Sequence, residues 1–224
     1  AHYKDDFGKT IAGFFSDEPE LGNGRLFGEI DMGTDSDFPW SDKLIPELEK
    51  SLGKDWRSRL ALVWCNNADP DETAFVRYFY MDAVTRLVSE NFSVQLGNWC
   101  REHGVKYIGH IIEDNDNHYR TGPSLGHYFR GLYGQAMAGI DNIGGQVYPQ
   151  KEDENGKWMK WLRRDGEFYH YTLAKLGQSL AALDPKKQGN CVCEIFGNYG
   201  WQEGFKLERY LADHFMVRGI NNYV

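Results

Sequence analysis

Short apolar runs alternate with longer helix-like stretches along the chain, and this alternation constrains the fold more than any other feature of the sequence. We predict strands at 10–16, 105–112, 140–147, 190–196 and 220–224, and helices at 41–52, 72–103, 124–138, 169–183 and 205–217. Strands that alternate with helices in this way are typical of parallel βα units. The sequence lacks a GxGxxG fingerprint after a strand and a GxxxxGKS/T loop, so nothing in it indicates a nucleotide-binding sheet.

Two segments interrupt the alternation. Residues 21–40 form a polar, glycine-rich stretch that is too long for a tight turn, and such loops usually cover a binding face. Residues 150–168 are charged and aromatic, and we interpret them as an exposed insertion. The sequence has neither an internal repeat nor a low-complexity linker, so we treat residues 1–224 as one domain.

The composition excludes some classes of protein. The chain has 224 residues, of which 41% are hydrophobic and 15% aromatic, which is sufficient for a globular core. It has no run of about 18 apolar residues, which argues against a membrane span. The net charge of −8 argues against nucleic-acid binding, because a phosphate backbone requires clustered Lys and Arg. The chain starts without a methionine or an apolar signal segment, which suggests a processed protein or a piece of a longer one.

The four cysteines, Cys65, Cys100, Cys191 and Cys193, do not indicate a zinc site, since no pair has the CxxC spacing. Cys191 and Cys193 lie two residues apart in a predicted strand, so their side chains point to the same face. We expect both to be reduced and packed against helices, with Glu194 on the opposite, interior face of the strand.

Acidic residues stand near four predicted strands, as Asp17-Glu18-Pro19-Glu20, as Glu113-Asp114, as Asp141 close to the start of the third strand, and as Glu194. Glycosidic bond cleavage requires two carboxyl groups, one that protonates the leaving oxygen and one that acts as base or nucleophile. An acid after a strand can instead cap a helix, and for Asp17, Asp114 and Asp141 both interpretations stay open. Glu194 ends an apolar strand with no helix directly after it, which favours a functional role.

Aromatic side chains lie close to these carboxylates in the sequence, and sugar rings stack well on aromatic faces. The residues that we expect to bind substrate are Asp17, Trp40, His110, Glu113, Tyr199 and Trp201. For Trp158 and Trp161, in the predicted insertion, we favour a place in a small side core or on the surface.

Five stretches in chain order resemble (β/α)8-barrel glycoside hydrolases. Residues 14–20 (FFSDEPE) look like the fourth-strand motif of these barrels, and residues 193–197 (CEIFG) look like the seventh-strand motif. Residues 39–44 (PWSDKL) and 99–104 (WCREHG) are similar to the large bacterial α-L-rhamnosidase-like glycosidases. The fifth stretch, residues 200–221, is similar to the same group and contains GW, YLADH and VRGIN.

The resemblance implies an α/β fold, specifically a partial (β/α)8 TIM barrel in which about five parallel strands are the fourth to the eighth. Strands one to three would then belong to a missing N-terminal part of the same polypeptide. It also implies a bacterial glycosidase of carbohydrate metabolism, periplasmic or secreted. Its partner would be an oligosaccharide or glycoside substrate, from which it removes a terminal sugar of a complex glycan.

The same resemblance assigns roles to the carboxylates. Glu18 matches the acid/base residue and Glu194 matches the nucleophile of the retaining enzymes. Asp17 stands where the family usually has an Asn that bonds the sugar 2-hydroxyl. The rhamnosidase-like enzymes are inverting and calcium-dependent, which makes Glu194 a general base or a sugar ligand. Calcium is then an optional cofactor, and we expect no other.

Two other functions stay open as alternatives. A non-catalytic carbohydrate-binding remnant would keep the aromatic cleft but lack a competent pair of carboxylates. Metal-dependent hydrolysis would need several of Asp17, Glu113, Asp114 and Asp116 to converge on one cation, for which oxygen ligands suit calcium or magnesium.

The glycosidase hypothesis predicts a geometry. Glu18 and Glu194 should project into one cleft with their carboxyl groups less than about 12 Å apart, because even inverting enzymes hold the pair within about 6.5–9.5 Å. Asp17 should point away from the cleft, since side chains alternate along an extended chain. Burial and the neighbouring Glu194 should raise the pKa of Glu18, because an acid must be protonated when it meets its substrate.

Overall fold

The computed structural model describes residues 2–21, 32–111, 125–157, 163–201 and 203–224. Five strands of this part of the chain are parallel: β1 (Gly13–Ser16), β2 (Lys106–Gly109), β3 (Ala138–Asn142), β6 (Cys191–Ile195) and β7 (Asn222–Tyr223). Two further strands, β4 (Asn155–Lys157) and β5 (Arg163–Asp165), form an antiparallel hairpin. Each parallel strand lies at a predicted segment, although β3 starts two residues before the predicted position.

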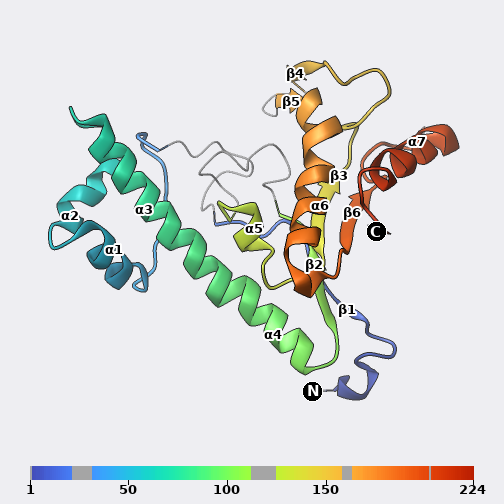
Figure 1. The fold of residues 1–224 in the computed structure, drawn as a ribbon, viewed down its shortest axis with the longest axis horizontal. Coiled ribbons are helices and arrows are strands. Elements are labelled where there is room, and N and C mark those ends of the chain that lie inside the picture. Colours follow the sequence, from blue (N-terminus) through green and yellow to red (C-terminus); the bar gives the residue numbers. More distant parts are fainter. Residues whose placement is uncertain (1, 22–31, 112–124, 158–162, 202) are drawn as a thin grey trace.

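The parallel strands follow one another in chain order. β1 pairs with β2, and β3, β6 and β7 pair in that order. Between these two sheets, the amide of Ala136 donates to the carbonyl oxygen of Tyr107 at 2.7 Å, and a Cβ on Gly139 would overlap the carbonyl oxygen of Gly109. β2 and β3 are therefore neighbours (Figure 1), and the fold is α/β with parallel sheets, as predicted.

The α-helices are α1 (Leu44–Leu52), α2 (Trp56–Arg59), α3 (Pro70–Val88), α4 (Gln95–Glu102), α5 (Tyr128–Gly131), α6 (Leu173–Leu183) and α7 (Gly204–Met216). π-helical turns at Ser89–Val94 join α3 to α4, so the predicted helix at 72–103 is present as one long rod (Figure 1). It ends before Gly104, whose φ of 71° is one that glycine adopts readily.

Three predicted segments differ from the structure. The helix expected at 124–138 is reduced, in the described residues, to α5, because the backbone of Gly134 packs directly on Ser93 and its amide donates to Ser93 Oγ at 2.9 Å. The strand expected at 140–147 ends at Asn142, since the glycines at 144 and 145 have positive φ. Phe168, the last residue of the insertion expected at 150–168, is buried in the core and not exposed. Trp158 and Trp161 lie outside the described residues.

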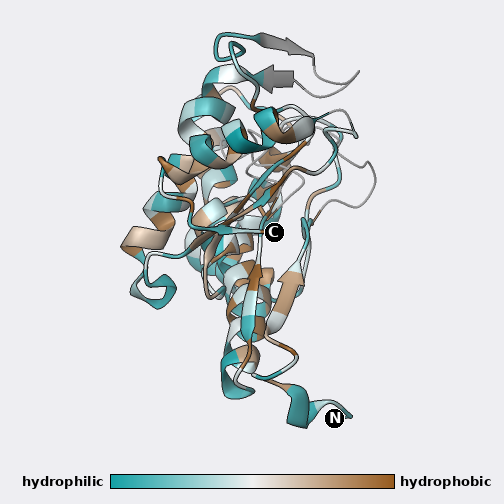
Figure 2. Ribbon diagram, turned by 90° about the vertical axis from the view of Figure 1, so that its right-hand side faces the viewer, coloured by the Kyte–Doolittle hydropathy of each residue, from teal (hydrophilic) through white to brown (hydrophobic). Residues whose placement is uncertain are grey.

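Three apolar clusters hold the described elements together. The larger of the two main clusters packs β3 and β6 against α5, α6 and α7, and the smaller lies between α1, α2 and α3. The third, of Cys100, Val105 and Tyr107, lies between α4 and β2. Figure 2 shows hydrophobic residues along the strands and hydrophilic ones on the outer turns of the helices. Cys191 and Cys193 are buried in the larger cluster, and a Cβ on Gly177 of α6 would come within 2.8 Å of Cys191 Sγ. Cys191 and Cys193 are therefore packed against a helix, as predicted, and all four cysteines are free thiols.

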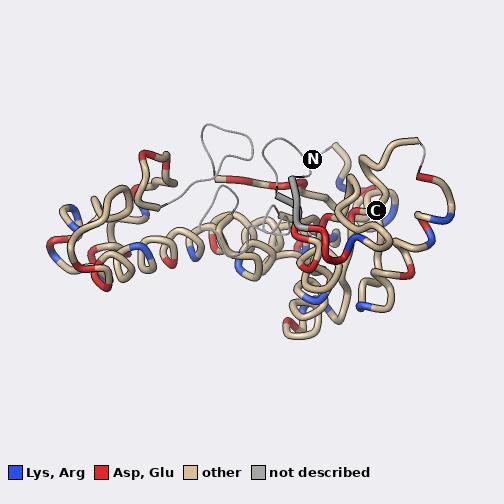
Figure 3. The backbone as a smooth tube through the Cα atoms, turned by 90° about the horizontal axis from the view of Figure 1, so that it is seen from above, with Lys and Arg blue, Asp and Glu red and all other residues tan. Residues whose placement is uncertain are grey.

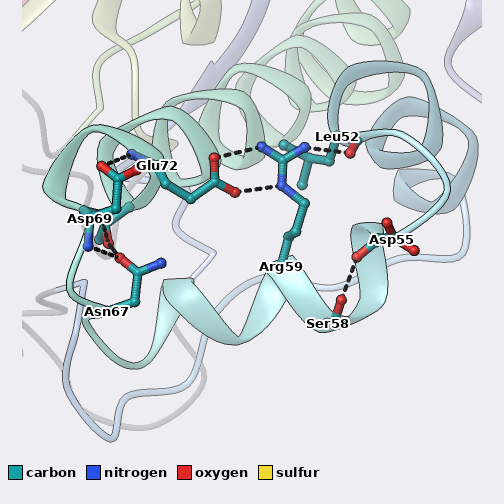
Figure 4. A network of polar contacts seen from close by, with 8 residues as sticks. Leu52, Asp55, Ser58, Arg59, Asn67, Asp69 and Glu72 are labelled. Carbon is teal, nitrogen blue, oxygen red and sulfur yellow. Dashed lines mark hydrogen bonds and ion pairs between the residues drawn. The ribbon is translucent and has the colours of Figure 1, made fainter.

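Polar contacts fix the start of the long rod (Figure 4). The carboxylate of Asp69 caps α3 by accepting from the amides of Asp71 at 3.0 Å and Glu72 at 3.2 Å. Arg59 of α2 bonds both carboxylate oxygens of Glu72, at 2.6 and 2.9 Å, and donates to the carbonyl oxygen of Leu52 at 2.5 Å. These bonds tie α1, α2 and α3 into one unit.

Charged residues of both signs are interspersed along α1, α2 and α3, as Figure 3 shows. In the part of the chain that the structure describes, no helix is both long enough and apolar enough to cross a membrane.

The close approach of β2 and β3 leads to a stability prediction. Gly139→Ala places a methyl group on the backbone of Gly109, and no side-chain rotation can relieve that overlap. We expect a loss of roughly 3 kcal/mol or more, at the upper end of overpacking costs, and a fall in Tm of roughly 6–12 °C. Lys106→Ala, at an exposed position of β2, is the control and should change Tm little. Equal Tm values for the two variants would show that β2 and β3 do not meet here.

Candidate functional site

Four strands end at the same edge and carry polar side chains there. Asp17 and Glu18 follow β1, His110 follows β2, and Asp141 and Glu194 are the penultimate residues of β3 and β6. Asp141 and Glu194 are also register partners in the β3–β6 pair, so their side chains stand side by side. The parallel sheets thus gather four carboxyl groups and one imidazole, which we call the carboxylate cluster.

His110 is the centre of the cluster. Its ring is only 2% exposed, and Nε2 lies 3.0 Å from Glu194 Oε2 and 3.4 Å from Asp17 Oδ1. Its amide donates to the carbonyl oxygen of Ser16 at 3.3 Å, and its ring packs edge-on against Phe15 at a centroid distance of 5.6 Å. His110 is therefore held from β1 on one side and from β6 on the other.

Glu18 and Asp141 meet the same imidazole. One carboxylate oxygen of each and one ring nitrogen of His110 all lie within 4.8 Å of one another. Since Glu194 contacts this ring as well, the carboxyl groups of Glu18 and Glu194 are closer than the limit of about 12 Å that the glycosidase hypothesis sets. Their catalytic roles stay a prediction.

The prediction that Asp17 points away from this edge was wrong. Asp17 lies beside His110, although its side chain is 74% exposed. The reason is the backbone of Glu18, whose φ of 42° is left-handed. The chain is therefore not extended after β1, and the alternation of side chains on which the prediction rested does not apply.

Asp141 is the most deeply placed carboxyl group of the cluster, with only 2% of its surface exposed. Burial raises its pKa to about 8, and the negative charges of Glu194, Glu18 and Asp17 add to this effect. The environment of Asp141 therefore favours its neutral, protonated form to a much higher pH than for an ordinary aspartate. From the sequence, Asp141 stayed an open choice between a helix cap and a functional acid. The third strand was predicted to begin at residue 140, which placed Asp141 near the start of this strand and not near its end.

The aromatic residues that we expected to bind substrate, Trp40, Tyr199 and Trp201, do not surround this cluster in the described residues. Tyr199 is turned inward, where its hydroxyl donates to the carbonyl oxygen of Val147 at 3.0 Å and lies 3.4 Å from Asn142 Oδ1. Burial raises the pKa of this phenol above its usual value. Tyr199 thus supports the loop after β3 through its hydroxyl group.

The two tryptophans lie elsewhere. Trp40 is half exposed, stacks on Trp56 and lines a mainly apolar cavity of about 320 Å³ between α1, α3 and the π-helical turns. Trp201 is fully exposed beside a second hollow formed with Phe196 and Glu203. The predicted binding residue Glu113, together with Asp114 and Asp116, lies outside the described residues.

The donors of the cluster could approach a cation, since Asp17, His110 and Glu194 also bring three potential ligand atoms within 4.8 Å of one another. Calcium, the cation that the family resemblance implies, takes six to eight oxygen ligands. The described donor set is centred on an imidazole nitrogen that already contacts Glu194. It therefore differs from a calcium shell, and no step proposed below uses a cation.

The neutral Asp141 predicts a pH dependence of stability. Because its pKa of about 8 in the folded state exceeds the ordinary aspartate value of 3.8, its contribution to stability is fully present below about pH 4 and is lost as the pH rises towards 8. We expect the free energy of unfolding to fall by about 1.4 kcal/mol per pH unit across this window, relative to Asp141→Asn, which binds no proton. Chemical denaturation between pH 4 and 9 measures this difference.

Asp213→Asn is the matched control, since it removes a carboxylate that is 63% exposed. If wild type and Asp141→Asn gave parallel curves across the same pH range, Asp141 would be ionised like an ordinary aspartate.

Comparisons with known proteins add one structural likeness. No protein-family model matches the chain, and no curated protein matches it. A solved structure of a rhamnosidase from Novosphingobium sp. PP1Y is similar over 83% of this chain, with a TM-score of 0.55 and 16% sequence identity. The chain spans only 16% of that protein's length. At this identity the likeness concerns the fold, and it agrees with an α/β arrangement of parallel strands.

Proposed function

We propose that this chain carries the acid/base centre of a glycoside hydrolase that removes a terminal sugar from a complex glycan. The observation that carries the proposal is the convergence of Glu18 from the end of β1 and Glu194 from the end of β6 on the same histidine. Two carboxyl groups that face one space are the minimum requirement for cleaving a glycosidic bond.

The order of the strands supports a partial (β/α)8 barrel as the scaffold. In the described residues, β1, β2, β3, β6 and β7 lie side by side in chain order, with helices between them. A doubly wound sheet would reverse its order at a switch point, whereas a barrel continues in one direction. Barrel enzymes hold their chemistry at the carboxyl ends of the strands, which is where the cluster lies. The likeness in fold to a rhamnosidase supports an α/β scaffold of parallel strands.

In the proposed reaction, Glu18 donates a proton to the leaving oxygen of the glycosidic bond. Glu194, of which one third of the side chain is exposed, acts from the other side as base or nucleophile. His110 orients Glu194 through the 3.0 Å contact of its Nε2. If Glu194 is the base, it takes a proton from a water molecule whose oxygen bonds the anomeric carbon as the leaving oxygen departs, and Glu194 then releases that proton to solvent while Glu18 regains one from solvent. If Glu194 is the nucleophile, its carboxylate oxygen bonds the anomeric carbon instead, and water hydrolyses this glycosyl-enzyme with Glu18 taking the proton of the water.

The rhamnosidase likeness makes a deoxyhexose such as rhamnose the first sugar to test. A carbohydrate-binding protein without hydrolysis is the second candidate function. The exposure of Trp40 and Trp201, away from the cluster, favours it, because such aromatic faces bind sugars without chemistry. Binding of the sugar without turnover would identify this second function.

The proposal predicts the effect of three substitutions in the whole natural polypeptide. Glu18→Gln and Glu194→Gln should each reduce kcat/KM on an aryl glycoside by roughly 10²–10⁴-fold, because general acid–base catalysis contributes about that factor. Glu20→Gln, two residues from Glu18, is the matched control and should retain nearly full activity. A panel of nitrophenyl glycosides, followed by absorbance, provides the measurement. Equal and mild losses in all three variants would place the acid elsewhere, with Glu113 the next candidate.

A further inference from the structure

We propose that Asp141 is a positioning residue of this site, which acts as a neutral hydrogen-bond donor beneath Glu18 and Glu194 rather than as a proton donor to the substrate. The inference rests on the proposed function, because it concerns how the same two carboxylates are held. It assigns a separate task to a third carboxyl group, for which a two-carboxylate mechanism has no role.

Asp141 lies deeper in the protein than Glu194 and Asp17. Asp141 is 2% exposed, whereas the side chains of Glu194 and Asp17 are 33% and 74% exposed. A sugar that reaches the cluster from solvent meets Glu194 and Asp17 before it meets Asp141. Contact with a glycosidic oxygen would require Asp141 to leave the core position that β3 gives it. Asp141 therefore acts on its neighbours and not on the substrate.

Charged and titratable groups from three strands face Asp141. Asp17 and Glu18 approach from the end of β1, His110 from the end of β2, and Glu194 from the adjacent strand β6. A negative charge on Asp141 would be repelled by Glu194 and Asp17, and also by Glu18 once it has given up its proton. Burial opposes ionisation further and raises the pKa of Asp141 to about 8. A protonated carboxyl group is the one carboxyl form that can donate a hydrogen bond to a carboxylate.

The proton on Asp141 therefore keeps the negative charge of the carboxylate cluster one unit lower than it would otherwise be. While Asp141 is neutral, Glu194 and Glu18 keep their places against His110. Once Asp141 ionises at alkaline pH, the added charge repels both and disturbs their contact with the imidazole. The proposal therefore predicts that activity falls above about pH 8 because of Asp141.

Two variants separate this role from the alternatives. Asp141→Asn has nearly the same shape, stays neutral at every pH and keeps an N–H donor, whereas Asp141→Ala removes the donor. Asp184→Asn is the matched control, since Asp184 is also a buried carboxyl group (8% exposed) but precedes β6 at the opposite end of the sheet. All variants are made in the whole natural polypeptide, and circular dichroism verifies that each is folded.

We expect Asp141→Asn to retain kcat/KM within about fivefold at pH 6–7 and to lose the alkaline fall in activity. Asp141→Ala should lose about 10–100-fold, the usual effect of removing one partner of a buried hydrogen bond. Asp184→Asn should keep the alkaline fall. If Asp141→Asn lost as much activity as Asp141→Ala while remaining folded, Asp141 would transfer a proton itself and the proposal would be wrong.

A measurement without substrate distinguishes failure of this inference from failure of the proposed function. The ring nitrogens of His110 are followed by ¹⁵N NMR between pH 5 and 9. The wild-type signal should shift near pH 8 as Asp141 ionises, and this shift should be absent in Asp141→Asn and present in Asp184→Asn. If no glycoside is cleaved but this shift is seen, Asp141 holds the cluster as proposed and the reaction is a different one. If the shift is identical in wild type and Asp141→Asn, Asp141 does not act on His110, whatever the reaction.

Discussion

The close approach of neighbouring strand backbones is the constraint on which the rest of this structure depends. A Cβ on Gly13 would overlap the backbone of Lys106, one on Gly109 would overlap Ser16, and one on Gly139 would overlap Gly109. These three glycines let β1, β2 and β3 meet with no side chain between them. Because the strands are parallel, the polar residues that follow them are brought to a single edge.

The imidazole of His110 makes this edge a site and not merely a set of acids. Four carboxyl groups within a few ångströms repel one another, and the structure reduces this repulsion in two ways. Two of the acids, Asp17 and Glu194, share the Nε2 atom of His110, and Asp141 keeps its proton because it is buried. The negative charge is thus smallest at Asp141, the buried end of the cluster, and largest at the solvent-exposed end, from which a sugar would approach.

Much of the fold could be predicted from periodicity. Each of the five parallel strands lies at a predicted apolar run, and the long helix from Pro70 to Glu102 was expected over nearly its full length, because apolar spacing reflects local geometry. The helix predicted at 124–138 was wrong for a reason outside that segment. The backbone of Gly134 packs on Ser93, about forty residues earlier in the chain, and no local pattern records such a contact.

The candidate site divides in the same way. The sequence by itself determined that Glu18 and Glu194 follow apolar strands, and the parallel βα pattern was sufficient to place both at one edge. Only the tertiary structure decided that Asp17 turns towards His110 and that Asp141 lies near the end of β3, buried beside other acids that raise its pKa. The first depends on the left-handed φ of Glu18 and the second on the register of β3 against β6. Both are set by contacts between distant segments, which the order of residues along one strand does not specify.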